Sequence, residues 1–120
     1  MKIIRSFAFA WNGLRICFTS ELNFRIHIVL AILAVVLGFV LQISHADWLA
    51  IAGCIVFVTV LEMVNTGIEQ LCNVVHQDIH PGIKKVKDIA AGAVLLSACC
   101  SLVIGLIVFL PKIIVYIKSI

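Results

Sequence analysis

The chain contains three long stretches in which hydrophobic residues follow one another almost without a break. They cover approximately residues 26–43, 48–75 and 88–110, and short polar segments separate them. A helix needs about 20 mainly apolar residues to cross the hydrocarbon core of a bilayer. The pattern therefore predicts an all-α membrane protein with three transmembrane helices. The second stretch is long enough to extend past a hydrocarbon core of roughly 30 Å.

Residues 1–20 show a different pattern, because apolar and polar positions would lie on opposite sides of a helix. The apolar side comprises Ile3, Ile4, Phe7, Ala10, Trp11, Leu14 and Phe18, and the polar side comprises Lys2, Arg5, Asn12 and Arg15. This pattern is typical of a helix that lies in the membrane interface, where Trp11 would act as an anchor. The alternative is an amphipathic helix exposed to the cytosol. We expect the surface helix, since the rest of the chain is so apolar.

The polar connectors give the expected limits of the helices. They comprise residues 19–27, 44–47 and 76–88. In the second connector Asp47 could cap the helix that follows. In the third, Pro81 and Gly82 form the expected turn, and Asp88 begins the last transmembrane helix. Pro111 is expected to end that helix and to leave residues 113–120 as a short tail.

The composition agrees with a membrane protein. Hydrophobic residues make up 63% of the 120 residues and charged residues only 12%, whereas soluble domains average about 45–50% and about 25%. At this length we expect a single domain over residues 1–120. The five cysteines form no CxxC pair, so they are interpreted as small apolar residues rather than as disulfide or zinc ligands.

The basic residues indicate the orientation in the membrane. Seven of the nine Lys and Arg residues belong to the N-terminal segment and the third connector, namely Lys2, Arg5, Arg15, Arg25, Lys84, Lys85 and Lys87. Only Lys112 and Lys118 belong to the segment expected on the opposite side of the membrane. The positive-inside rule therefore predicts a cytoplasmic N-terminus. The net charge of +3 is modest and gathers at the membrane boundaries, which fits lipid headgroups better than nucleic acid.

A polar stripe runs along the second transmembrane helix. Glu62, Asn65, Glu69 and Asn73 recur at spacings of three, four and four, which places them on one helix face. A charged side chain that faces lipid costs several kcal/mol, so this face is expected to line a bundle interior or a polar cleft. Counted from Trp48, Glu62 lies about 21 Å along the helix and Glu69 about 32 Å. Glu62 is then in the membrane, and Glu69 is near the cytoplasmic surface.

This arrangement permits phosphoryl transfer from a nucleotide to a lipid. Mg²⁺ is commonly held by one or two carboxylates together with substrate phosphates, and Glu21 and Glu69 are at the depth expected for such a pair. Lys87 could neutralise phosphate charge. Glu62 lies where it could act as a general base on a lipid hydroxyl, with Asn65 to orient it or the substrate.

Other function classes also fit the stripe. Glu62 and Glu69 could be relay groups of a small oligomeric proton or ion pathway that needs no nucleotide. The stripe could instead serve the assembly of a structural membrane subunit. His27 and His45 are interpreted as ordinary interface residues.

Two sequence motifs resemble those of the bacterial integral-membrane diacylglycerol kinase family, which includes undecaprenol kinases. The first is Glu62-x-x-Asn65-Thr66-Gly67-Ile68-Glu69, and the second is Lys87-Asp88-x-x-Ala91-x-Ala93-Val94-Leu95. Two upstream patterns, Trp11-x-Gly13-Leu14-Arg15 and Glu21-x-x-Phe24-Arg25, are similar to the family's N-terminal part. The resemblance covers nearly the whole chain.

The resemblance implies a homotrimer of three-helix protomers, each with an N-terminal surface helix, in the bacterial inner membrane. It implies a kinase that uses Mg²⁺ and ATP to phosphorylate diacylglycerol or undecaprenol. By motif position, Glu62 is the catalytic base, Glu21 and Glu69 bind the metal, and Lys87 and Asp88 contact the nucleotide. Asp78 and His80 fall in a nucleotide-contacting loop, while Arg15 and Arg25, with Glu62, belong to the lipid site.

One position departs from the family's pattern. The family commonly has an aspartate one helical turn after the second glutamate, and this chain has Asn73 there. An asparagine keeps a hydrogen-bonding oxygen but removes the negative charge. We therefore expect a less negative site that remains active, with an altered affinity for metal or nucleotide.

Overall fold

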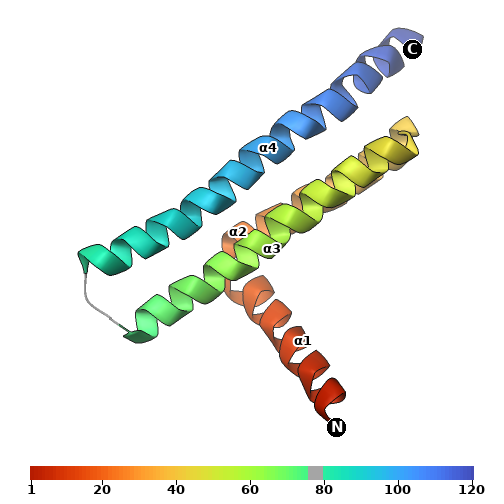
Figure 1. The fold of residues 1–120 in the computed structure, drawn as a ribbon. Helices are drawn as coiled ribbons and strands as arrows, with labels where there is room; N and C mark the ends of the chain where they lie inside the picture. The colour runs from red at the N-terminus through yellow and green to blue at the C-terminus, as the bar shows by residue number, and fades with distance from the viewer. Residues whose placement is uncertain (76–79) are drawn as a thin grey trace.

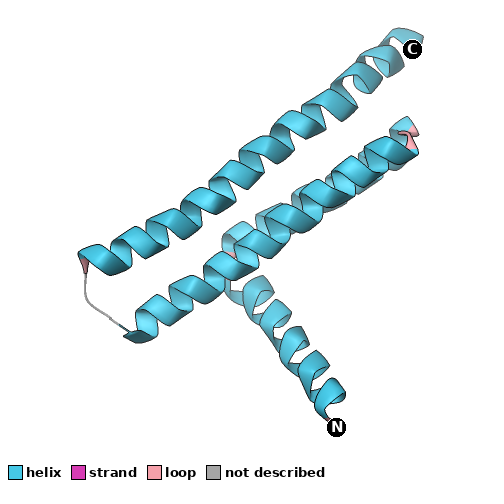
Figure 2. Cartoon of the chain, in the orientation of Figure 1, coloured by secondary structure: helices cyan, strands magenta, loops and turns pink. Residues whose placement is uncertain are grey.

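The computed structural model describes residues 1–75 and 80–120, and its ordered elements are four α-helices. They are α1 (Lys2–Ser20), α2 (Leu22–Leu41), α3 (His45–Val75) and α4 (Pro81–Ser119). The secondary-structure view shows helices and short loops throughout this part of the chain (Figure 2). The prediction of an all-α fold is confirmed.

Three of the helices can cross a membrane by length and composition, and they are α2, α3 and α4. They run alongside one another, with α3 in contact with both α2 and α4, while α1 diverges from the other three (Figure 1). The presence of three helices long and apolar enough to span a membrane agrees with the prediction, although α2 begins at Leu22, inside the expected connector of residues 19–27. Most large apolar side chains of these helices are exposed on the single chain, as expected for a surface that meets lipid or other subunits.

The α2–α3 turn is the tightest packed part of the fold. Gln42 ends α2 in the left-handed conformation (φ 52°), and the Ile43 N–H donates to the Gly38 carbonyl at 3.2 Å, which is a usual way to close a helix. The Trp48 ring lies so close to Gly38 that a Cβ there would be 2.7 Å from it. The Phe39 and Trp48 ring centroids are 4.8 Å apart. This end of the bundle has no room for a larger residue at position 38.

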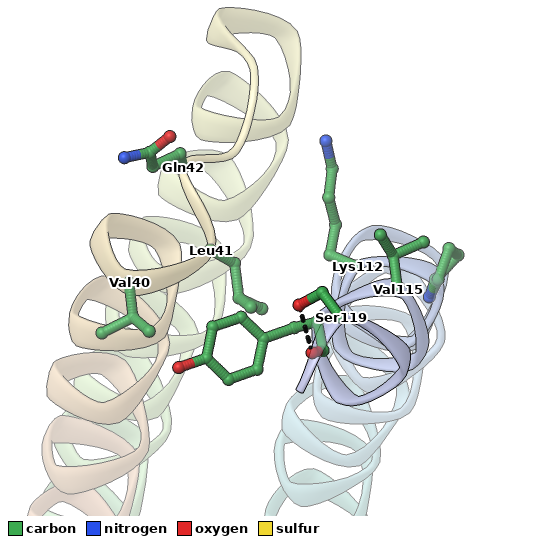
Figure 3. Close-up of a pocket in the computed structure, with 8 residues that line it drawn as sticks. Val40, Leu41, Gln42, Lys112, Val115 and Ser119 are labelled. Atoms are coloured by element: carbon green, nitrogen blue, oxygen red, sulfur yellow. Dashed lines mark hydrogen bonds between the residues drawn. The ribbon is translucent and has the colours of Figure 1, made fainter.

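The buried apolar core lies next to this turn. It joins Ile43 and Ile51 with Val108 and Phe109 from the C-terminal half of α4. Beyond it, α2 and α4 enclose a cavity of about 680 Å³, lined by Val40, Leu41, Gln42, Pro111, Lys112, Val115, Tyr116 and Ser119 (Figure 3). The cavity is therefore at the opposite end of the bundle from the start of α4.

The limits of α4 differ from those predicted. The helix begins at Pro81 rather than at Asp88, because His80 caps it: the Gly82 N–H donates to His80 Nδ1 at 3.0 Å. Proline is well suited to the first position of a helix, where its missing N–H is not needed. The expected turn at Pro81 and Gly82 is therefore wrong, since both residues belong to the first turn of α4.

The C-terminal end of α4 was also predicted wrongly. The helix continues through Pro111 to Ser119, so residues 113–120 are not a separate tail. A proline in a helix removes one backbone donor and crowds the preceding turn, but here apolar helix-compatible residues continue on both sides. At the start of α3, Asp47 is not the cap, because its own N–H donates to Ser44 Oγ at 3.1 Å.

Candidate active site

Glu62 lies on α3 with only 2% of its surface exposed. Its Oε2 is 3.8 Å from Nε2 of His27 on α2. Thr66, one turn further along α3, is also buried and donates its hydroxyl hydrogen to the Glu62 carbonyl at 3.0 Å. A buried charge needs a partner to offset the loss of its hydration, and His27 is the side chain placed to provide one.

Asn65 and Glu69 are linked directly along the same face of α3. Asn65 Nδ2 donates to Glu69 Oε1 at 3.3 Å, and Asn65 is buried while Glu69 is half-buried. Asn65 Oδ1 is also buried and has no hydrogen-bond partner among the described residues. Most buried oxygens in proteins are paired, so this oxygen is available to a ligand. Within the stripe predicted from the sequence spacing, Asn65 and Glu69 are therefore directly bonded.

Glu21 forms the junction between α1 and α2. Its backbone is extended (φ −115°, ψ 109°), its N–H donates to the Cys17 carbonyl at 3.1 Å, and its carbonyl accepts from the Arg25 N–H at 3.3 Å. The break between the helices lets the Glu21 carboxylate interact electrostatically with Glu62. Glu69 interacts with Glu62 in the same way. Two carboxylates from different parts of the chain therefore act electrostatically on Glu62.

Cys17 lies on the α1 side of this region and is 5% exposed. Burial raises the pKa of its thiol, the Glu21 carboxylate raises it further, and a hydrogen bond with Thr66 opposes both effects. The thiol is therefore kept in its neutral form. It packs α1 against α3 beside Thr66 and Glu62.

Asn73 and Lys87 connect α3 to α4. Lys87 Nζ donates to Asn73 Oδ1 at 2.8 Å, and the two residues are 14 positions apart in the sequence. Lys87 is half-buried, so its ammonium group is held in place on the polar side of the bundle. The side chain of Asn73 positions the lysine but leaves its positive charge uncompensated, which suits a group that binds phosphate.

The other predicted nucleotide contacts are more peripheral. Asp88 is exposed and pairs with Lys84 at 2.7 Å, one turn earlier on α4. His80 is exposed and caps α4. Asp78 lies outside the described residues. In the structure, Asp88 therefore pairs within α4 and His80 caps the start of that helix.

The two arginines predicted for the lipid site differ in position. Arg15 lines a cavity of about 520 Å³ between α1 and α2, with Trp11, Leu14, Phe18, Phe24 and Ile28 as the other lining residues. Five of these six residues are apolar, so the cavity suits a hydrocarbon chain beside one cationic group. Arg25 is exposed on α2 and does not line this cavity.

Sequence reasoning missed the proximity of His27 to Glu62. The two residues lie at nearly equal distances along the chain from the α2–α3 turn, so an antiparallel pair of helices joined there places them at a similar level. Counting outward from the turn would have placed the two residues at a similar level, but not on facing sides of the helices. His45, by contrast, is exposed at the first position of α3, as expected for an interface residue.

The residues present fit a divalent cation that is shared with phosphate groups. The described part of the chain holds no cluster of three or more His, Cys, Asp or Glu residues that could bind a metal alone. Mg²⁺, however, commonly takes one or two carboxylates and completes its shell with phosphate oxygens and water. Glu21 and Glu69 supply carboxylates, and the unpaired Asn65 Oδ1 is an oxygen donor of the same kind.

Comparisons with known proteins agree with the motifs. The sequence profile described as prokaryotic diacylglycerol kinase matches residues 8–109. This chain belongs to that family. Its enzyme class, a lipid kinase, was predicted from the motifs and is confirmed.

Several curated relatives are similar over most of this chain. The undecaprenol kinase of Bacillus subtilis (strain 168) is 36% identical over 111 residues, which cover 92% of this chain and 90% of the relative. The diacylglycerol kinase of Synechocystis sp. is 34% identical over 92% of this chain but only 63% of its own length. The diacylglycerol kinase of Escherichia coli (strain K12) is 27% identical over 80% of this chain and 79% of the relative.

The contact between Asn73 and Lys87 makes the departure at position 73 testable. We expect Asn73→Asp to retain lipid kinase activity and to change the KM for the nucleotide by no more than about fivefold. The reason is that an aspartate would turn the hydrogen bond into a partly exposed ion pair, which typically contributes about 1 kcal/mol or less. Steady-state kinetics with varied nucleotide would measure the change.

A matched control is Gln70→Glu, which adds the same charge to an exposed position on the same part of α3. The prediction would be contradicted if the wild-type chain were almost inactive and Asn73→Asp restored a normal rate.

Proposed function

We propose that this protein transfers the γ-phosphoryl group of ATP to the hydroxyl group of a membrane lipid, with Mg²⁺, at the cytoplasmic interface. The acceptor is diacylglycerol or undecaprenol, the alcohols in the names of its relatives. The observation that carries the proposal is the buried Glu62 carboxylate. It shares one face of α3 with Asn65 and Glu69, which lie closer to the end of α3 that we propose is cytoplasmic. In the proposed membrane setting, a base at the depth of the lipid headgroups would share one helix face with ligands nearer the aqueous phase.

In the proposed reaction Glu62 is the general base. A Glu62 oxygen accepts the proton of the lipid hydroxyl while the hydroxyl oxygen forms a bond to the γ-phosphorus. The bond between that phosphorus and the oxygen that bridges it to the β-phosphorus breaks, and ADP leaves with the electron pair. The proton on Glu62 passes to water before the next cycle. The products are the lipid phosphate, ADP and one proton.

The remaining site residues would bind and orient the substrates. Glu21 and Glu69 would hold Mg²⁺, which supplies neutralisation of phosphate charge when bound. Lys87, held by Asn73, would contact phosphate oxygens. Asn65 would offer its unpaired Oδ1 to a hydroxyl donor or to the metal. Asp88, Asp78 and His80 would make the more peripheral nucleotide contacts implied by the family motif.

The acceptor lipid would enter from the side of the bundle. The apolar cavity between α1 and α2 supports this route, because Arg15 is its one charged lining residue and a headgroup oxygen could bind there. Phe24, which also lines the cavity, is 3% exposed and belongs to the helix that carries His27. Arg25 would then contact headgroups at the membrane surface.

The proposal includes the setting of the enzyme. Helix α1 would lie in the cytoplasmic interface of the bacterial inner membrane, the N-terminus would be cytoplasmic, and residues 1–120 would act as one domain. The chain would assemble as a homotrimer with sites shared between protomers. Support comes from the distribution of Lys and Arg and from the many apolar side chains that are exposed on a single chain.

The decisive experiment is ATP-dependent phosphorylation of both alcohols by the purified wild-type protein in detergent or bilayers. We expect transfer of labelled γ-phosphate to at least one of the two lipids, with a requirement for Mg²⁺. Head-to-head kcat/KM values identify the preferred acceptor. Failure to phosphorylate either lipid would contradict the proposal, whereas conductance that depends on Glu62 but not on nucleotide would favour an ion pathway.

A further inference from the structure

The contact between His27 and Glu62 has no role in the proposed reaction described above. Nε2 of His27 lies 3.8 Å from Oε2 of Glu62, and the two side chains are 20% and 3% exposed. That distance is within the range of an ion pair but is longer than a hydrogen bond. The two residues come from different helices, α2 and α3. Their contact therefore depends on how these helices pack.

The titratable groups that the structure describes around Glu62, apart from His27, are acidic or neutral. Glu21, at the α1–α2 junction, and Glu69, on α3, both interact with Glu62 electrostatically, and both are carboxylates. Cys17 faces the same region from α1 with a neutral thiol. The cation Lys87 of α4 contacts Asn73, about 16 Å along α3 from Glu62. Among these groups, His27 is the one whose side chain lies close enough to pair with Glu62.

The geometry also leaves one oxygen of the base available. His27 approaches Oε2 of Glu62, so Oε1 is the oxygen that remains for an acceptor hydroxyl. A carboxylate held from one side loses less freedom when it binds its substrate. The imidazole thus has two effects, since it fixes the orientation of the base and compensates its charge.

We propose that His27 is a positioning residue that forms an ion pair with Glu62 and holds its carboxylate oriented for proton abstraction. This inference rests on the proposed function, in which Glu62 is the general base. His27 itself touches neither substrate and transfers no proton in the reaction. It acts only through Glu62, so its effect should disappear when Glu62 no longer carries a charge.

A double-mutant cycle tests this dependence. His27→Leu should lower kcat about tenfold in the wild-type background, within the range of coupling between contacting residues, and should leave the KM values for ATP and lipid within about twofold, because neither substrate contacts His27. In the Glu62→Gln background, His27→Leu should cause no further loss. Equal losses in both backgrounds would overturn the proposal.

Two replacements of His27 separate charge from hydrogen bonding. His27→Lys should recover most of the rate lost in His27→Leu, because it restores a cation beside the carboxylate. His27→Gln should recover little, since its amide can donate a hydrogen bond but carries no charge. Equal recovery by glutamine would overturn the charge-pairing role. His45→Leu, at an exposed histidine at the far end of α3, is the matched control and should retain the wild-type rate.

Thermal unfolding of the same variants in detergent provides a readout besides activity. His27→Leu should lower Tm when Glu62 is present, because it leaves a buried carboxylate unpaired, and should not lower Tm in the Glu62→Gln background. Equal decreases in Tm would overturn the pairing. If the wild-type chain phosphorylates neither alcohol, both the proposed function and the positioning role are wrong. If the wild type is active but the effects of His27→Leu and Glu62→Gln are additive, only the positioning role is wrong.

Discussion

Glu62→Gln is expected to lower kcat for lipid phosphorylation by a factor of about 10²–10⁴, the usual contribution of a positioned general base. The amide has nearly the same shape as the carboxylate but cannot accept the hydroxyl proton. Because the shape is conserved, the variant should still fold, and its Tm reports the loss of the pair with His27. Initial rates with labelled ATP, and Tm in the same detergent, would measure both effects.

The control for this variant is Asp47→Asn, the same acid-to-amide change in the first turn of α3, at the opposite end from the site. It should retain the wild-type kcat. A Glu62→Gln protein that keeps more than about half of the wild-type rate would show that the base is another group, and the site would have to be reassigned.

Glu69→Gln is expected to raise the Mg²⁺ concentration needed for half-maximal activity by about 10–100-fold or more. Loss of an outer-shell partner of a metal already costs about that much, and Glu69 is proposed as a direct ligand. The glutamine oxygen can still accept the hydrogen bond from Asn65, so the polar face should keep its shape. Titrations of Mg²⁺ at saturating ATP would measure the shift.

Removal of the metal provides the companion test. Excess chelator should abolish the wild-type rate, and added Mg²⁺ should restore it. Gln70→Ala, next to Glu69 but exposed, is the control and should have the wild-type Mg²⁺ dependence. An unchanged dependence in Glu69→Gln would contradict the assignment of Glu69 as a metal ligand.

The parts of the fold that follow from periodicity were predicted correctly. Long apolar runs predicted three helices that are long and apolar enough to span a membrane. The spacing of Glu62, Asn65 and Glu69 predicted one shared face, where the structure joins Asn65 to Glu69. Both features depend on residues within one helix. They therefore need no knowledge of how the helices pack.

The helix limits were harder to predict, because polar residues and prolines were treated as breaks. Lys84 and Asp88 instead form an ion pair one turn apart within α4. Pro81 begins that helix, and Pro111 lies within it. Local composition marks where a helix leaves the apolar core of the membrane, which is not always where its backbone hydrogen bonds end.

Contacts between helices could not be read from one sequence. The pair of His27 and Glu62, the bond from Lys87 to Asn73 and the place of Cys17 beside Thr66 each join two helices. Each depends on the relative rotation of the helices about their axes. A single histidine in an apolar segment gives no sign of which neighbour it meets, so it was interpreted as an interface residue.

The tight α2–α3 turn has a consequence for motion. The two helices are joined there by a short connection between Leu41 and His45, and the Trp48 ring packs against Gly38, so a change in the angle between them would pivot at that end. Glu62 lies about 26 Å from the start of α3, so a rotation of about 10° would move it about 4–5 Å relative to α2. A small change of angle at a closed hinge is therefore enough to bring His27 and Glu62 together or to part them.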